Sequence, residues 1–118
     1  MTVRRIVANI AGTDMAAARA FYGDLFGLEV GMDLGWIVTF VADTRAISQM
    51  SVMSEGGSGA PVPDISIEVD DLQSVHERAV SGGYEIVYPL ADEPWGVRRF
   101  FVRDPFGKTI NVLSHTGG

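Results

Sequence analysis

The sequence predicts an α+β domain made of two βαβββ halves, and three observations support this. The chain has 118 residues, 47% of them apolar, which suits one globular domain with its own core. Short segments of similar sequence recur about 60 residues apart, as an internal repeat would: 14–15 with 71–72, 40–43 with 101–104, and 49–54 with 109–114. Each half also repeats one order of strand, capped helix and further strands.

The first half begins with a β-rich segment, residues 3–11, that we expect to form a strand. Thr13 or Asp14 can cap the helix that follows, and Gly27 can end it because glycine tolerates a left-handed backbone. Apolar residues at helical spacing predict the buried stripe of this helix: Met15, Ala18, Tyr22 and Leu25. Further strands are expected near 28–33, 35–42 and 46–53.

A segment rich in Gly, Ser and Pro, residues 56–61, lies at the midpoint of the chain. This composition is typical of flexible linkers. We therefore expect one domain over residues 1–118, with half-repeats 1–55 and 62–118 joined by this linker. Ser58 is expected to be part of the connector and not a nucleophile, because it does not stand on a turn between a strand and a helix.

The second half repeats the pattern of the first. Ile65, Ile67 and Val69 alternate with polar residues, as in a half-buried strand. Asp70 or Asp71 can cap the next helix, which Gly82 and Gly83 end after a buried stripe formed by Leu72, Val75 and Ala79. Strands are expected near 84–89, 97–103 and 108–114.

Composition excludes several classes of protein. The absence of cysteine rules out disulfides and thiolate metal sites, and agrees with a reducing cytoplasm. The net charge of −6 argues against a nucleic-acid partner and favours a neutral or cationic ligand. No apolar run approaches the roughly 18 residues of a membrane span, so we expect no membrane association and a cytoplasmic location.

Three segments carry a resemblance to a known family: residues 14–28 with FYGDLFGL, residues 67–72 with IEVDDL, and residues 95–108 with WGVRRFFVRDPFGK. In these the chain resembles the vicinal oxygen chelate superfamily, which includes glyoxalases, bleomycin-resistance proteins and extradiol dioxygenases. The resemblance covers nearly the whole chain. It implies that the two halves together form a cupped mixed sheet. It does not imply one activity, because a single fold hosts many functions.

Metal-dependent members of this superfamily hold a divalent ion with His and Glu ligands. The resemblance places the corresponding positions at Val7, Ser51, Asp64 and Asn111. Only Asp64 offers a good ligand, so we expect no metal and no other cofactor. His76, on the second predicted helix, and His115, after the last strand, are expected to be surface residues outside any metal site.

Aromatic and polar residues near the expected cup predict a ligand site. Polar candidates are Gln49, Ser51, Asp64 and Asn111, and aromatic candidates are Trp36, Phe40, Trp95 and Phe100. Arg98 is expected to share a face with Phe100, where it needs an acidic partner or an anionic ligand group. The alternatives are that Phe40 and Phe100 belong to the core, that Arg98 forms a structural ion pair, and that the cup binds nothing.

These residues favour a metal-independent protein that binds a small molecule, similar to bleomycin-resistance proteins that sequester an aromatic or cationic antibiotic. The alternative is a lyase- or isomerase-like enzyme in which Asp64 is the general base and Arg98 stabilises an oxyanion. The resemblance also implies a homodimer, formed by packing or by exchange of halves. Glyoxalase or dioxygenase activity is not expected, because it depends on the missing ligands.

Overall fold

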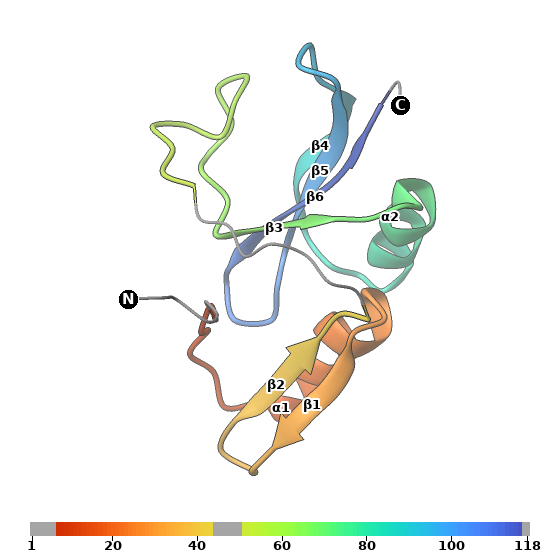
Figure 1. Cartoon of the computed structure of the whole chain (residues 1–118). Coiled ribbons are helices and arrows are strands. Elements are labelled where there is room, and N and C mark those ends of the chain that lie inside the picture. The colour runs from red at the N-terminus through yellow and green to blue at the C-terminus, as the bar shows by residue number, and fades with distance from the viewer. Residues whose placement is uncertain (1–6, 44–50, 117–118) are drawn as a thin grey trace. The chain divides into compact units, whose positions relative to one another are not determined.

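The computed structural model describes residues 7–43 and 51–116. They fall into two units, divided between Val52 and Met53 (Figure 1). The first unit holds two helical segments and a hairpin: α1 (Met15–Ala18), η1 (Arg19–Leu25), β1 (Glu29–Asp33) and β2 (Val38–Val41). The second holds β3 (Ile65–Glu68), α2 (Leu72–Ser81), β4 (Ile86–Asp92), β5 (Val97–Arg103) and β6 (Thr109–His115). No helix within these ranges is long and apolar enough to cross a membrane.

The helical segment of the first unit begins at Asp14, whose carboxylate accepts a hydrogen bond of 3.0 Å from the Ala17 amide. From residue 19 onward the segment is a π-helix, and it stops before Gly27, which has φ +70°. The buried residues are Ala18, Phe21, Tyr22 and Leu25, whereas the predicted stripe had Met15 in place of Phe21. The wider π-helical turn changes the residue spacing, so two consecutive aromatic side chains face inward.

The hairpin of the first unit pairs β1 with β2 in antiparallel register. The Tyr22 and Phe40 rings lie 5.8 Å apart, which connects β2 to the π-helix. The strand expected at 3–11 is not seen in its described part, because residues 7–11 have no regular structure. Of the strand expected at 46–53, residues 46–50 lie outside the described ranges and residues 51–53 are not in a strand.

The second unit confirms the predicted βαβββ order, with a sheet of strand order β3-β6-β5-β4. β3 runs parallel to β6, and the other neighbours are antiparallel. Asp71 caps α2 by accepting a 3.1 Å hydrogen bond from the Ser74 amide. The predicted stripe of this helix is buried, and Gly83, with φ +76°, follows its end. β4 lies at an edge and contains Pro89, whose missing N–H is tolerated there.

The sheet of the second unit has two different faces, because successive strand residues point to opposite sides. On the side of α2 lie fully buried residues, and the His76 ring meets the Phe100 ring edge-on at 4.9 Å. On the other side, register pairs Asn111 with both Ser66 and Phe101. We call the part of this side formed by β3 and β6 the open face; its residues are Ser66, Glu68, Asn111, Leu113 and His115.

The segment expected to be a flexible linker instead forms a hydrogen-bonded turn. The Gly56 amide donates to the Ala60 carbonyl at 2.8 Å, and the Ala60 amide donates to the Gly57 carbonyl at 2.9 Å. Gly56 and Ala60 are buried, and a Cβ at Gly56 would lie 2.0 Å from the Pro61 carbonyl oxygen. Only glycine fits there, so the composition reflects a tight turn and not a free connector. We call residues 56–60 the 56–60 turn.

Candidate functional site

The open face carries polar side chains from two neighbouring strands, with the apolar Leu113 between Asn111 and His115 on β6. Asn111 Nδ2 donates to Ser66 Oγ at 3.1 Å, and His115 Nδ1 lies 2.6 Å from Glu68 Oε2. The Asn111 Oδ1 atom is buried and accepts no hydrogen bond from the described protein. Because a buried acceptor without a donor is costly, this oxygen is the natural place for a donor group from a bound molecule.

Asp64 precedes β3 and is tied into the sheet. Its Oδ2 accepts a 2.8 Å hydrogen bond from the Thr109 amide, and its own amide donates to the Thr109 carbonyl at 2.8 Å. The carboxylate therefore holds the starts of β3 and β6 together. The residue is exposed, so Asp64 retains a second carboxylate oxygen at the rim of the open face.

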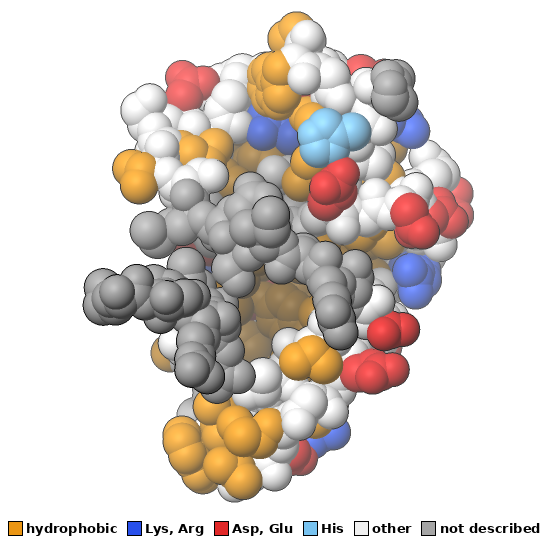
Figure 2. Space-filling model, in the orientation of Figure 1, with side chains coloured by type: hydrophobic (Ala, Val, Ile, Leu, Met, Phe, Trp, Pro, Cys, Tyr) orange, Lys and Arg blue, Asp and Glu red, His pale blue; other side chains and the backbone are white. Residues whose placement is uncertain are grey.

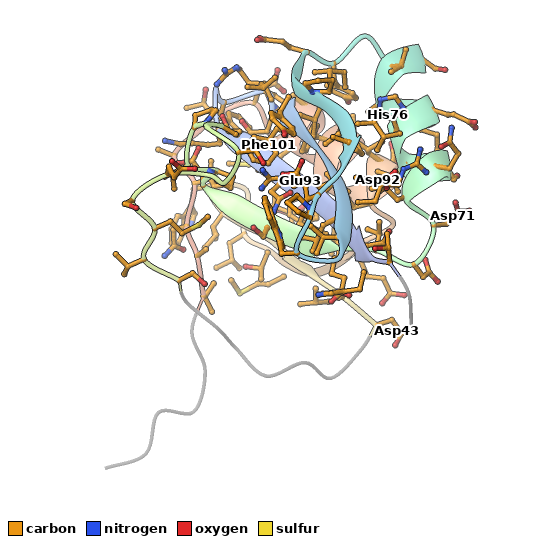
Figure 3. The ribbon with its side chains drawn as sticks, turned by 90° about the horizontal axis from the view of Figure 1, so that it is seen from above. Asp43, Asp71, His76, Asp92, Glu93 and Phe101 are labelled. Carbon is orange, nitrogen blue, oxygen red and sulfur yellow. The ribbon has the colours of Figure 1, made fainter. Side chains whose placement is uncertain are left out.

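A buried ion pair lies on the same side of the sheet, under the 56–60 turn. Arg99 Nη2 and Glu93 Oε2 are 3.1 Å apart, and each side chain is 4% exposed. The remaining acceptor positions of Glu93 are filled by Tyr88 Oη at 3.0 Å and Ser58 Oγ at 2.9 Å. Figure 3 shows Glu93 close to Phe101, with His76 on α2 apart from them.

The Arg99 guanidinium also holds the 56–60 turn. It donates to the Gly56 carbonyl at 2.7 Å through Nη1 and to the Gly57 carbonyl at 3.1 Å through Nη2. Its central carbon lies about 5 Å from three ring centroids, those of Tyr88, Trp95 and Phe101. Its Nε atom is buried and donates to no described atom.

The aromatic residues predicted to contact a ligand are divided between the two units of the chain, two in each. Trp95 is 51% exposed, beside the turn, as a rim residue would be. Trp36 is 75% exposed in the loop between β1 and β2, in the other unit. Phe40 packs on Tyr22, in agreement with the core alternative. The ligand role of Phe100 is wrong, because this ring is fully buried on the α2 side of the sheet.

On the side of β5 that α2 does not cover, the arginine is Arg99, whereas the sequence prediction chose Arg98 as the arginine near the ligand. Arg98 is half-exposed and forms an ion pair with Asp92 at 3.6 Å, so the structural alternative for Arg98 is confirmed. Both strand faces carry apolar residues next to these arginines, namely Phe100 and Phe101. The apolar periodicity of β5 could not decide whether Arg98 or Arg99 lies on the side away from α2, because that depends on which face of the sheet α2 covers.

Two of the predicted polar residues fall in residues 1–52 and not in the second unit. Ser51 is exposed outside any strand, and Gln49 lies outside the described residues. Glu68, Ser66 and His115 were not predicted as site residues. Strand alternation was the signal that could have found them, because it puts Ser66 with Glu68, and Asn111 with His115, on one side of their strands. The register of β3 against β6 then brings both sets to the same face of the sheet.

Asp64 and Arg98 do not form one catalytic centre. Asp64 bonds to Thr109, which pairs with Arg103 at one end of β5, whereas Arg98 pairs with Ser114 near the other end. Arg103 and Arg98 are five positions apart on β5, about 16 Å along the strand. A general base and an oxyanion-stabilising group must both reach one reacting centre, and this separation prevents it.

The residues at the superfamily's metal-ligand positions do not fit a divalent ion. Val7 has no donor atom, Ser51 offers a neutral hydroxyl, and the Asn111 amide is bonded to Ser66. Asp64 is the one carboxylate among these four positions. Within residues 7–43 and 51–116, no three His, Asp or Glu side chains gather as a metal site would require.

Comparison with known proteins agrees with this fold. Residues 4–112 match the model of the Glyoxalase/Bleomycin resistance protein/Dioxygenase superfamily, and the chain belongs to this superfamily. Over 111 residues it is 28% identical to "Putative glyoxylase CFP32" of Mycobacterium bovis and to its namesake in Mycobacterium tuberculosis. This match covers 88% of the chain and 42% of each relative, so the chain spans less than half of their length.

Solved structures show the same fold. TioX from Micromonospora sp. ML1 is similar with a TM-score of 0.63 and 23% identity, over 97% of this chain and 98% of TioX. A lactoylglutathione lyase from Agrobacterium tumefaciens gives a TM-score of 0.59 and 24% identity, over 86% of each chain. At such identities the likeness extends to the fold and not to the activity.

Proposed function

We propose that this protein binds a small molecule on the open face without a metal ion. The observation that carries the proposal is Asn111 Oδ1, a buried acceptor with no donor from the described protein. Around it, the Ser66 hydroxyl and the Glu68 carboxylate offer further hydrogen bonds, and the net charge of −6 favours a neutral or cationic ligand. An N–H donor group on the ligand would complete this set.

We propose further that the ligand contains an aromatic ring, as an antibiotic held by a sequestering protein often does. The half-exposed Trp95 ring supports this, because it offers a face for stacking beside the same side of the sheet. The name of the superfamily includes bleomycin-resistance proteins, which makes bleomycin a suitable first probe.

A second copy of the chain is the partner we propose. The β1–β2 hairpin exposes several large apolar side chains: Val30, Met32, Leu34, Trp36 and Val41. Figure 2 shows an orange patch over the tip of this hairpin. Exposed apolar patches of this kind mark contact surfaces. We also propose a cytoplasmic location, since the chain has no cysteine to be oxidised elsewhere.

Metal-free bleomycin and tryptamine, an aromatic amine, test the binding proposal. We expect the chelator-treated protein to bind at least one of them, seen as quenching of Trp95 fluorescence in a Trp36→Phe background. Asn111→Leu should weaken this binding about tenfold, because the acceptor is lost. Ser114→Ala on the same strand, but on the α2 side, should leave binding unchanged.

Two results would contradict the proposal. One is binding that requires added Fe, Ni, Mn or Zn. The other is equal loss of binding in both variants, which would mean that Asn111 acts through the stability of β6 and not through the ligand.

A further inference from the structure

Arg99 is held by acceptors that a ligand could replace. Two of its partners are backbone carbonyls of the 56–60 turn, at 2.7 Å and 3.1 Å, one on each terminal nitrogen. The side chain is only 4% exposed, and its buried Nε atom has no acceptor among the described residues. A guanidinium presents its donors as a planar fork that matches the two oxygens of a carboxylate.

The 56–60 turn covers this guanidinium under backbone strain. Gly57, Ser58 and Gly59 all adopt positive φ, at 88°, 51° and 77°, and Ser58 is not a glycine. A left-handed backbone is unfavourable for serine, so the closed turn depends on the bonds that hold it, including Ser58 Oγ to Glu93. In Figure 1 the segment that contains this turn forms a loop before β3, beside the sheet, with no helix or strand.

We propose that the 56–60 turn is a strap that opens over Arg99, and that the opened strap exposes a binding site for an aromatic carboxylate. The carboxylate accepts from Nη2 through one oxygen, in place of the Gly57 carbonyl, and from Nε through the other oxygen. The aromatic ring stacks against Trp95, which is already half-exposed at the edge of the strap. This site shares the Trp95 ring with the proposed open-face site, but it binds the charged group of its ligand at Arg99 and not at Asn111.

The closed strap reduces the apparent affinity for such a ligand, since only the open fraction can bind. A substitution that disfavours the closed turn without touching Arg99 should therefore improve binding. Gly59→Ala does this, because Gly59 has φ +77° and a Cβ there would meet no atom within 4 Å. Gly57 is less suitable, because a Cβ there would lie 2.8 Å from the Trp95 ring.

Benzoate is the probe, and benzyl alcohol is the uncharged control with the same ring. Binding is followed by the NMR signals of Arg99 Nε–H and of the amides of the 56–60 turn. We expect Gly59→Ala to bind benzoate about tenfold more tightly than the unchanged protein. Gly107→Ala is the matched control: it also has positive φ, 79°, and open space, but lies in the turn before β6, so it should leave benzoate affinity unchanged.

Three results would overturn the proposal: benzoate affinity that does not rise in Gly59→Ala, an equal rise in Gly107→Ala, or benzyl alcohol binding as well as benzoate. Arg99→Gln in the Gly59→Ala background should abolish binding. If that variant does not fold, the Nε–H shift on adding benzoate to Gly59→Ala still decides the matter. Asn111→Leu distinguishes the two proposals: it should weaken tryptamine or bleomycin binding and leave benzoate binding at Arg99 unchanged.

Discussion

Neighbouring residues on β5 form ion pairs in opposite environments. Arg98 and Asp92 meet near the surface, where water screens the interaction, and Arg99 and Glu93 meet in the interior. A buried charge that loses its partner cannot be rescued by solvent. The two pairs therefore differ in their importance for folding, although their members are adjacent along the chain.

Glu93→Gln should lower the free energy of unfolding by about 3 kcal/mol, because it leaves the Arg99 charge unpaired in the interior. Asp92→Asn should cost less than about 1 kcal/mol, since its pair with Arg98 is exposed. Urea denaturation measures both. Similar losses for the two variants would show that Glu93 is not buried as described.

Phe100 provides a second test of side-chain placement. Phe100→Leu should destabilise the protein by about 1–2 kcal/mol and leave ligand binding unchanged, because the ring packs on His76 and not on the open face. Trp95→Leu should do the reverse, weakening tryptamine binding with a smaller effect on stability. Urea denaturation measures the stability of both variants, and isothermal titration calorimetry measures their tryptamine binding.

At the scale of single elements, a capping residue decides where α2 begins. The sequence leaves Asp70 and Asp71 as alternatives, and the structure places the cap at Asp71 through its bond to the Ser74 amide. Local pattern could not choose, because both residues are acidic and precede the same apolar stripe. Local pattern also failed to predict the π-helix of the first unit. Its wider turn buries Phe21, which does not fall on the apolar stripe of an ordinary α-helix.

Asp71→Ala should lower the free energy of unfolding by about 1 kcal/mol, the usual effect of a lost helix N-cap. Asp70→Ala is the control and should change it by less than half as much, because this exposed residue is not the cap. Thermal unfolding followed by circular dichroism measures both. Equal effects would mean that the two carboxylates act through general charge near the helix N-terminus.

At the scale of the whole molecule, membership of the superfamily defines the fold and leaves the assembly to be tested. The exposed apolar side chains of the β1–β2 hairpin support a homodimer. Trp36→Ser should weaken dimerisation at least about tenfold, because a largely exposed Trp is a typical interface anchor. Analytical ultracentrifugation at micromolar concentration measures this, and a monomer at all concentrations would contradict the dimer.

Local features followed from the sequence alone. They are the buried stripe of α2, the span of β5 and, from the succession of such elements, the βαβββ order of the second unit. They depend on residues a few positions apart, so local spacing reports them directly. The superfamily was also evident from short motifs, notably WGVRRFFVRDPFGK. The site depends instead on contacts between distant segments. Only the tertiary structure could place Arg99, and not Arg98, beneath the 56–60 turn, because α2 covers the opposite side of the sheet.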